Sequence, residues 1–148
     1  MSEEFWAEFV ENTGIDGPYE AWAFGDGSLS DLATELALLV RDGPKRATAG
    51  LASEYEAGGE SLPKAGDLSL ILDGHGTPVC VIRTTRVEIR RFSDVDEAFA
   101  WDEGEGDRTL EWWRRAHERF FEGLGIKIDQ DTLMMLEHFD LLWPTPRT

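Results

Sequence analysis

Apolar side chains recur with helical spacing in four segments of the chain. The clearest segment begins at a capping residue, Ser30 or Asp31, and ends at Gly43, with leucines and a valine at the i, i+4, i+7 and i+8 positions, which fall on one helical face. The same reasoning predicts three further helices: a short amphipathic one that Ser2 caps, another over residues 94–101, and a longer one over residues 109–124.

Runs rich in Val, Ile, Leu and Thr predict four strands, at residues 45–51, 68–73, 79 to about 92, and 133–143. A turn at residues 73–76 joins the second and third of these as a hairpin. The third run is long enough to bend around a barrel. Residues 12–30, rich in glycine and aromatic side chains, are predicted to form an ordered loop. We therefore expect an α+β fold with a barrel core.

Length and composition limit the class of protein. A chain of 148 residues with 41% hydrophobic side chains suits one domain with one sizeable core. Its N-terminus has no basic and apolar leader, and no run approaches the roughly 18 apolar residues of a membrane span, so we expect a soluble cytoplasmic protein without a membrane partner. Cys80, the single cysteine, lies in an apolar run and is expected to be buried and unreactive.

The charge distribution is uneven. The net charge is −16, yet residues 43–91 carry a balance of +1 and the remainder −17. Such acidity argues against binding to duplex DNA. A near-neutral middle segment with several arginines is compatible with a small anionic ligand held at one place.

Lys45 and Thr48 follow the predicted helix stop at Gly43 and begin a predicted strand. A threonine hydroxyl becomes a nucleophile when a base removes its proton, and a lysine acts as that base where burial lowers its pKa. The string K-x-x-T is common, so an exposed Lys and a strand Thr are the alternative. Four carboxylates within residues 102–107 form either a solvated acidic loop or a source of one inward-facing acid beside Lys45.

The remaining candidates favour structural roles. Three histidines, His75, His117 and His138, have no Cys, Asp or Glu partners at metal-ligand spacing, so no metal site is expected. Trp112 and Trp113 could stack on a base, but their helical spacing favours core packing. The glycine-rich phosphate loop, the G-x-S-x-G elbow and the H-E-x-x-H motif are all missing from the sequence.

Several segments in one order resemble the ASCH domain family, in its longer prokaryotic branch. They are residues 19–26, 32–40, 43–48, 54–67, 79–89 and 103–114, so that the resemblance covers about residues 19–143. It implies a PUA-like mixed β-barrel flanked by helices, with a cleft for RNA or nucleosides. The whole chain, 1–148, would be a single ASCH domain, with an N-terminal helix and loop over 1–30 and a barrel core over about 31–143.

The resemblance also implies site residues. Lys45 and Thr48 match the family's G-x-K-x-x-T motif, and the acid corresponds to Glu105, with Glu103 as the alternative. Family members include a hydrolase of N4-acetylcytidine, a ribonuclease and RNA-binding domains. The expected activity is hydrolysis of a cytidine-like nucleoside or of RNA, with Thr48 as nucleophile, Lys45 as base and Glu105 as orienting acid.

The expected ligand contacts are Arg46, Arg83, Arg86 and Tyr55, and no cofactor is expected. The expected partner is a nucleoside or single-stranded RNA. Two alternatives remain open at this stage: a binding module without catalysis, and a sensor or protein-interaction domain.

Overall fold

The structure, a computed structural model, describes residues 2–25, 29–57 and 61–144. Its centre is a five-stranded sheet with the strand order β1-β3-β4-β5-β2. The outer pair β1–β3 is parallel and the other pairs are antiparallel. The strands are β1 (Tyr19–Ala23), β2 (Ala47–Leu51), β3 (Leu68–Leu72), β4 (Pro78–Arg91) and β5 (Leu133–Trp143).

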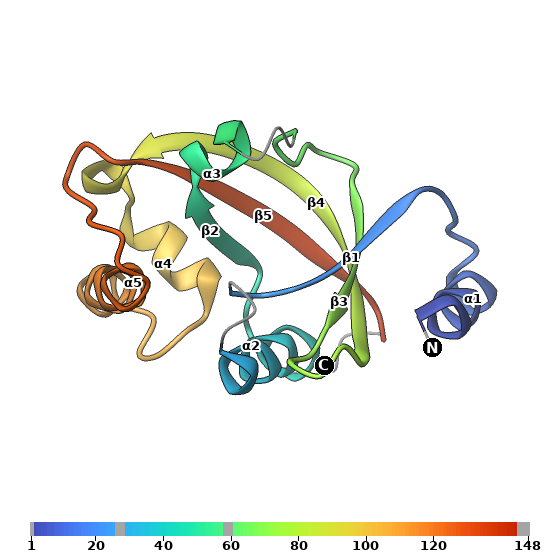
Figure 1. The fold of residues 1–148 in the computed structure, drawn as a ribbon. Coiled ribbons are helices and arrows are strands. Elements are labelled where there is room, and N and C mark those ends of the chain that lie inside the picture. The colour runs from blue at the N-terminus through green and yellow to red at the C-terminus, as the bar shows by residue number, and fades with distance from the viewer. Residues whose placement is uncertain (1, 26–28, 58–60, 145–148) are drawn as a thin grey trace.

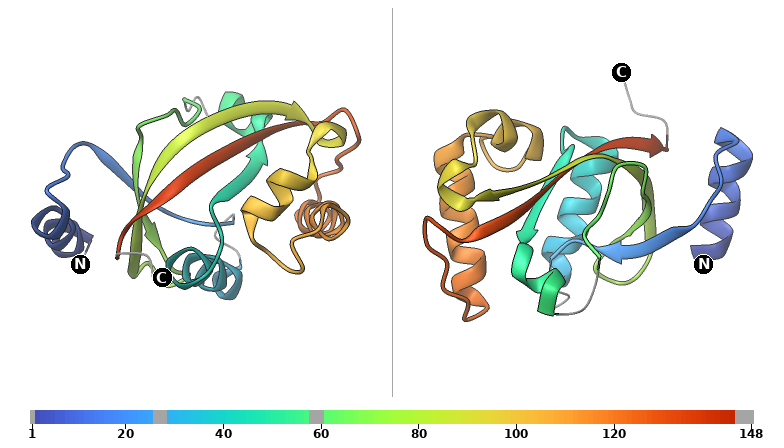
Figure 2. Two further views of the ribbon diagram at one scale, coloured as in Figure 1. Left: turned by 180° about the vertical axis from the view of Figure 1, so that it is seen from behind. Right: turned by 90° about the horizontal axis from the view of Figure 1, so that it is seen from above.

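The helices gather in separate places around the sheet (Figure 1). They are α1 (Ser2–Thr13), α2 (Ser30–Asp42), α3 (Ala52–Ala57), α4 (Glu97–Glu103) and α5 (Leu110–Gly123), with a single 3-10 turn η1 (Phe92–Asp94). Both views in Figure 2 place α4 and α5 at one end of the long strands and α1 at the other. No helix within the described part of the chain is long and apolar enough to cross a bilayer.

The long strands β4 and β5 give the sheet its curved shape. They pair over most of their length, with register shifts at Val81/Ile82 and Thr84/Arg86, and such irregularities bend and twist a sheet. Figure 1 shows the two strands arching together across the molecule. The expected α+β fold with a barrel core is therefore confirmed, the barrel taking the form of a curled half-barrel sheet of five strands.

The apolar run of β4 is continuous because helices cover both faces of the sheet there. Val81 packs with Trp6 and Phe9 of α1, whereas Cys80 and Ile82 pack with the side of the sheet that α2 covers. Successive strand residues point to opposite faces, so covering both faces buries every position. Cys80 is buried, as expected, and burial raises the pKa of its thiol to about 12.

A third cluster of buried side chains fills the other end of the sheet. Trp113 and Phe121 of α5 pack with Phe99 of α4 and with β2 and β5. This cluster holds α4 and α5 against the strands that carry the candidate site.

Two predictions about secondary structure were wrong, and one helix was missed. The expected loop 12–30 contains β1, whose short, half-exposed pattern lacks the alternation that predicts strands. The short helix α3 was not expected at all. Neither Ser30 nor Asp31 caps α2, because the capping position is Leu29 and no side chain bonds the first turn. The helix does stop at Gly43 as expected.

Candidate functional site

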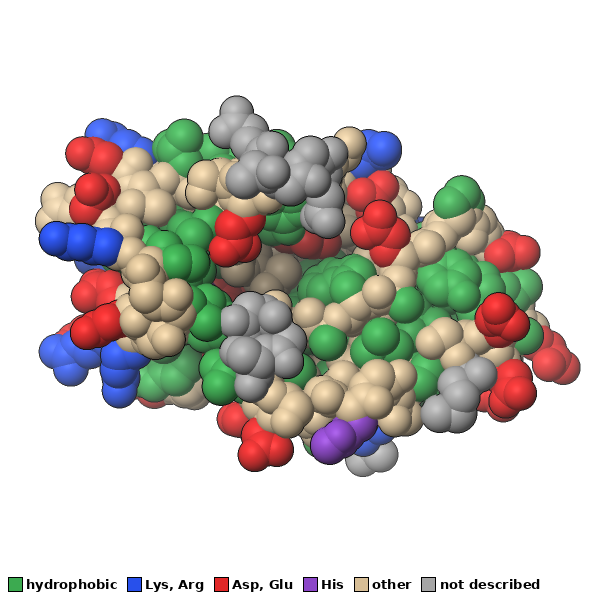
Figure 3. Space-filling model, in the orientation of Figure 1, with side chains coloured by type: hydrophobic (Ala, Val, Ile, Leu, Met, Phe, Trp, Pro, Cys, Tyr) green, Lys and Arg blue, Asp and Glu red, His purple; other side chains and the backbone are tan. Residues whose placement is uncertain are grey.

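A cavity of about 750 Å³ opens between α2, α3, α5 and the strands β2 and β5. Figure 3 shows this face of the molecule hollowed near its centre, with acidic side chains beside the hollow. Aromatic side chains form much of the wall: Trp22, Phe24, Trp112 and Phe120. Polar side chains also line it: Thr48, Tyr55, Glu103, Glu105, His117 and Glu137. A concave, largely apolar wall with a few convergent polar groups is typical of small-molecule sites.

Lys45 lies behind this wall, in the connection from α2 to β2. Its side chain is 1% exposed, and its Nζ donates hydrogen bonds to the Ala47 carbonyl at 2.8 Å and to Glu105 Oε2 at 2.7 Å. Glu103 Oε1 lies 3.5 Å from the same nitrogen. The Phe24 ring covers Nζ from 5.4 Å. A buried ammonium needs such partners.

Gly104 lets the two glutamates flank Lys45. It ends α4 in the left-handed conformation, with φ 68°. A Cβ at this position would lie 2.8 Å from the Lys45 backbone nitrogen and 2.9 Å from its Cα, which is closer than a side chain tolerates. A glycine therefore permits both the turn and the close approach of the two backbones.

Glu103 is held from α5 as well as from Lys45. Trp113 Nε1 donates a hydrogen bond to Glu103 Oε2, and His117 Nε2 lies 3.6 Å from Glu103 Oε1. His117 Nδ1 is 2.8 Å from the Trp113 carbonyl oxygen. Because a carbonyl only accepts, Nδ1 carries the proton, and burial lowers the pKa of His117.

The two carboxyl groups have opposite protonation tendencies. Burial raises the pKa of Glu103 well above its ordinary value, and the neighbouring Glu105 adds to this rise against the pull of Lys45. Burial also acts to raise the pKa of Glu105, but the Lys45 ammonium and hydrogen bonds from Glu103 and Lys45 outweigh it and lower this pKa to about 2. The cluster thus combines a neutral acid, a carboxylate and an ammonium, a division that paired catalytic carboxyls also use.

Thr48 reaches the cavity from β2. It pairs with Glu137 of β5 in the antiparallel register, and both side chains line the cavity. Lys45, bonded to the carbonyl of the residue just before Thr48, is thereby fixed at the base of the same strand.

Comparison with known proteins decides the family. The model of the ASCH domain family matches residues 20–142. The chain belongs to the ASCH domain family. The ASCH domain has a PUA-like fold and is in general an RNA-binding domain, so the resemblance seen in the sequence is confirmed.

Two solved structures resemble this ASCH domain over nearly its whole length. Protein EF3133 from Enterococcus faecalis V583 is 36% identical, with a TM-score of 0.80, over 95% of this chain and 89% of that one. An ASCH domain from Lactobacillus crispatus JV V101 is 32% identical, with a TM-score of 0.81, over 95% and 93% of the two chains. No curated protein matches the sequence.

Of the ligand contacts expected from sequence, Tyr55 alone lines the cavity of this ASCH domain. Arg46 turns its guanidinium to the carbonyls of Val40, at 3.0 Å, and Lys45, at 2.6 Å, so it ties the end of α2 to the start of β2. Arg83 is exposed on β4 and lies outside the cavity lining.

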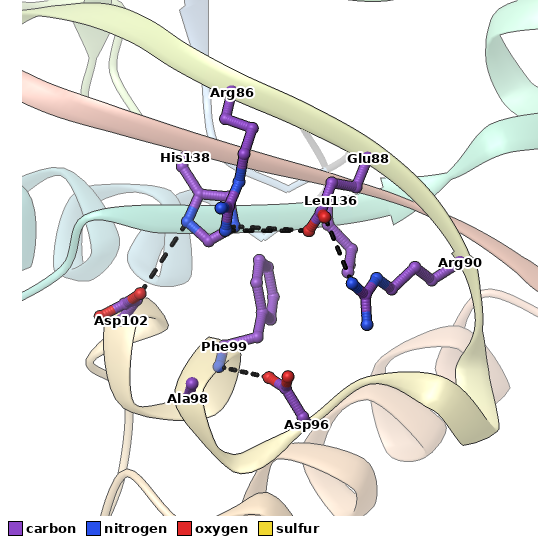
Figure 4. Close-up of a pocket in the computed structure, with 9 residues that line it drawn as sticks. All are labelled: Arg86, Glu88, Arg90, Asp96, Ala98, Phe99, Asp102, Leu136 and His138. Atoms are coloured by element: carbon purple, nitrogen blue, oxygen red, sulfur yellow. Dashed lines mark hydrogen bonds and ion pairs between the residues drawn. The ribbon is translucent and has the colours of Figure 1, made fainter.

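Arg86 lines a second, smaller recess of about 230 Å³ between α4 and the strands β4 and β5 (Figure 4). Its Nη2 lies 3.1 Å from His138 Nε2, and Asp102 Oδ2 lies 3.9 Å from His138 Nδ1. Burial, helped by Arg86, lowers the pKa of His138. Strand alternation and the bulge at Thr84/Arg86 turn this arginine away from the Lys45 cluster.

Sequence reasoning missed the roles of Trp113 and His117 in the site. The two residues are four apart on α5, their rings stack with centroids 4.1 Å apart, and that spacing was the available signal. No group of three or more His, Cys, Asp or Glu side chains suited to a metal ion occurs in residues 2–25, 29–57 and 61–144.

Proposed function

We propose that this ASCH domain binds a nucleoside in the cavity and hydrolyses an acyl amide on its base, as in an N4-acylated cytidine. The observation that carries the proposal is the buried contact of 2.7 Å between Lys45 Nζ and Glu105 Oε2, at a cavity wall that Thr48 shares with Glu105. A hydroxyl, an amine and a carboxylate so arranged are the components of nucleophilic catalysis by threonine.

In this proposal the Thr48 hydroxyl attacks the amide carbonyl carbon and its proton passes to Lys45. Because the pKa of Glu105 is about 2, Glu105 is ionised in the free protein. The amine becomes neutral only when its proton moves to Glu105 across the short contact. Lys45 therefore acts as the base only while Glu105 carries the proton that Lys45 has given up.

Glu103 is suited to protonate the leaving amine. It lines the cavity, and burial favours its neutral form. Breaking the C–N bond with this proton releases the amino base and leaves an acyl-Thr48 ester. Attack by water on the ester then releases the carboxylic acid and restores the hydroxyl, and the proton held by Glu105 passes to Glu103, which returns both carboxyl groups to their starting states.

The charge of the lining favours an uncharged nucleoside over a phosphodiester. Five glutamates line the cavity, Glu35, Glu54, Glu103, Glu105 and Glu137, and Arg119 is the one cationic side chain among the described lining residues. Even with Glu103 neutral, such a lining repels phosphate. We therefore favour amide hydrolysis over RNA cleavage.

A nucleoside- or RNA-binding module without catalysis is the second candidate. Lys45 is 1% exposed, is engaged with Ala47 and Glu105, and is not itself in contact with the cavity. This observation fits an ion pair that only shapes the pocket wall.

Incubation with N4-acetylcytidine, followed by chromatography of the cytidine formed, tests the proposal. We expect turnover by the wild type and by Thr85→Ala, an exposed β4 threonine outside the cavity, and a loss of at least ~10²-fold in Thr48→Ala. A short single-stranded RNA in parallel reports cleavage. Binding of cytidine without turnover by the wild type would establish the non-catalytic alternative.

A further inference from the structure

Glu137 is a buried carboxyl of the cavity that the proposed reaction does not use. It lies on β5, is 4% exposed, and accepts a hydrogen bond of 2.7 Å from Thr84 Oγ1 at its Oε2 atom. Its other oxygen, Oε1, has no hydrogen bond to any residue of the described ranges, while the side chain lines the cavity. Arg114 Nε is the one fully buried side-chain nitrogen or oxygen atom without a partner in the described ranges, so Oε1 is accessible, and a ligand in the cavity that Glu137 lines can reach it.

The sheet register places Glu137 beside Thr48. The two residues are directly opposite in the antiparallel β2–β5 pair, and such pairs point to the same face with Cβ atoms roughly 4.5–5.5 Å apart. A ligand needs only a few bonded atoms to bridge the distance between these two side chains. A base that presents its exocyclic amide to Thr48 therefore presents the adjacent ring edge to Glu137.

The surroundings of Glu137 favour its neutral form. Burial raises the pKa of the carboxyl, the Thr84 hydrogen bond opposes this, and the charge of Asp67 adds to the rise. A neutral carboxyl offers one O–H donor together with acceptor capacity. This pairing complements a ring nitrogen acceptor next to an N–H donor, which is the edge of cytosine and its N4-acyl derivatives.

We propose that Glu137 is a specificity-determining residue, which recognises the ring nitrogen and the adjacent exocyclic N–H of an uncharged base while Thr48 faces the reacting group. The inference rests on one part of the proposed function, namely that the cavity binds a nucleoside. Thr84 acts through Glu137, because its hydroxyl fixes the carboxyl group without lining the cavity.

The test measures binding of cytidine and of 3-deazacytidine, which lacks the ring nitrogen acceptor, by calorimetry at mildly acidic pH. We expect the wild type and Glu20→Gln, an exposed strand glutamate outside the cavity, to prefer cytidine by roughly tenfold or more. Glu137→Gln should keep the preference, because its amide also offers a donor and an acceptor. Glu137→Met should bind both ligands equally.

The ratio of the two affinities separates recognition from a structural effect, since a distorted pocket weakens both ligands alike. A wild-type ratio in Glu137→Met would overturn the inference. Should that variant not fold, Thr84→Val replaces it, with a reduced ratio expected and an unchanged one contradicting the inference. Turnover that depends on Thr48 with an unaltered ratio in these variants leaves the proposed function standing without the inference. An altered ratio in a protein that shows no turnover supports the role of Glu137 and contradicts the proposed hydrolysis. Absence of nucleoside binding by the wild type contradicts both proposals.

Discussion

Two charge clusters meet at the end of α4 and differ in their exposure to water. Asp102 faces the recess with Arg86 and His138 (Figure 4), whereas the next residue, Glu103, faces Lys45. The side chains of Arg86 and Asp102 are 62% and 47% exposed, but those of Lys45 and Glu103 are 1% and 2% exposed. Adjacent residues at the end of one helix thus place one carboxyl group in water and the next in the interior.

The difference determines what each cluster can do. Exposed ion pairs contribute little to stability because water and salt screen them. Buried charges interact strongly but cost much to desolvate, so each must be matched. The Lys45 cluster meets this requirement with one ammonium, one carboxylate and one neutral acid. Water is largely excluded from these groups, which is the condition under which proton transfer between them can be controlled.

Lys45→Met should cause the largest loss in the free energy of unfolding. The variant keeps the length of the side chain but removes the cation that offsets the burial of the Glu105 carboxyl group, which costs about 3–5 kcal/mol. Chemical denaturation measures the loss in the free energy of unfolding. The double variant Lys45→Met/Glu105→Gln should recover part of this loss because no unmatched charge remains. A loss below that of an exposed substitution would contradict the matched-charge description.

Glu105→Gln should show a pH-dependent loss of stability of up to about 3 kcal/mol. The folded pKa of about 2 lies below the ordinary value of 4.5, so folding favours the ionised form. The contribution is complete above about pH 4.5 and disappears as the pH falls towards 2. Unfolding free energies of wild type and variant should therefore converge in acid. A constant gap across this range would show that Glu105 acts through packing alone.

Gly104→Ala should cost about 1–3 kcal/mol. The residue has φ 68°, and a Cβ would press on the backbone of Lys45 at 2.8–2.9 Å, so the two glutamates must shift from the ammonium. Gly123→Ala is the matched control, because it lies in α5 with open space around its Cβ position and should be neutral or stabilising. Equal effects at both positions would remove the close-approach argument.

The elements of the fold were more predictable from sequence than the partners within the site. The hairpin β3–β4 and the helix α5 have strong local patterns, because one buried face forces a repeat of apolar residues. The strand β1 has no such signal, since it is an edge strand with a half-exposed pattern and gains its place by pairing with β3.

Within the site, the K-x-x-T motif indicated Lys45 and Thr48, and the resemblance to ASCH domains indicated a glutamate. Whether Glu103 or Glu105 meets Lys45 could not be decided from spacing, and the structure brings both to it. The three arginines expected as ligand contacts lie outside the lining of the cavity, which sequence could not show because it gives charge but not direction. Arg86 and Thr84 stand two apart across a bulge, and one is exposed while the other is buried.

Arg86→Gln should have the smallest effect on stability, within about 0.5 kcal/mol, because the side chain is mostly in water. Its local effect is still measurable. Burial and Arg86 together lower the pKa of His138, and the guanidinium lies 3.1 Å from the ring. Removing the charge of Arg86 should therefore raise the pKa of His138, because Asp102 and Glu88 remain to favour the imidazolium. Titration by NMR measures this shift, with His117 on α5 as an internal control that should not move. Because a raised pKa stabilises the fold as the pH falls, the variant should gain stability relative to the wild type in mild acid. An unmoved His138 pKa would show that the charge of Arg86 does not affect the protonation of the ring.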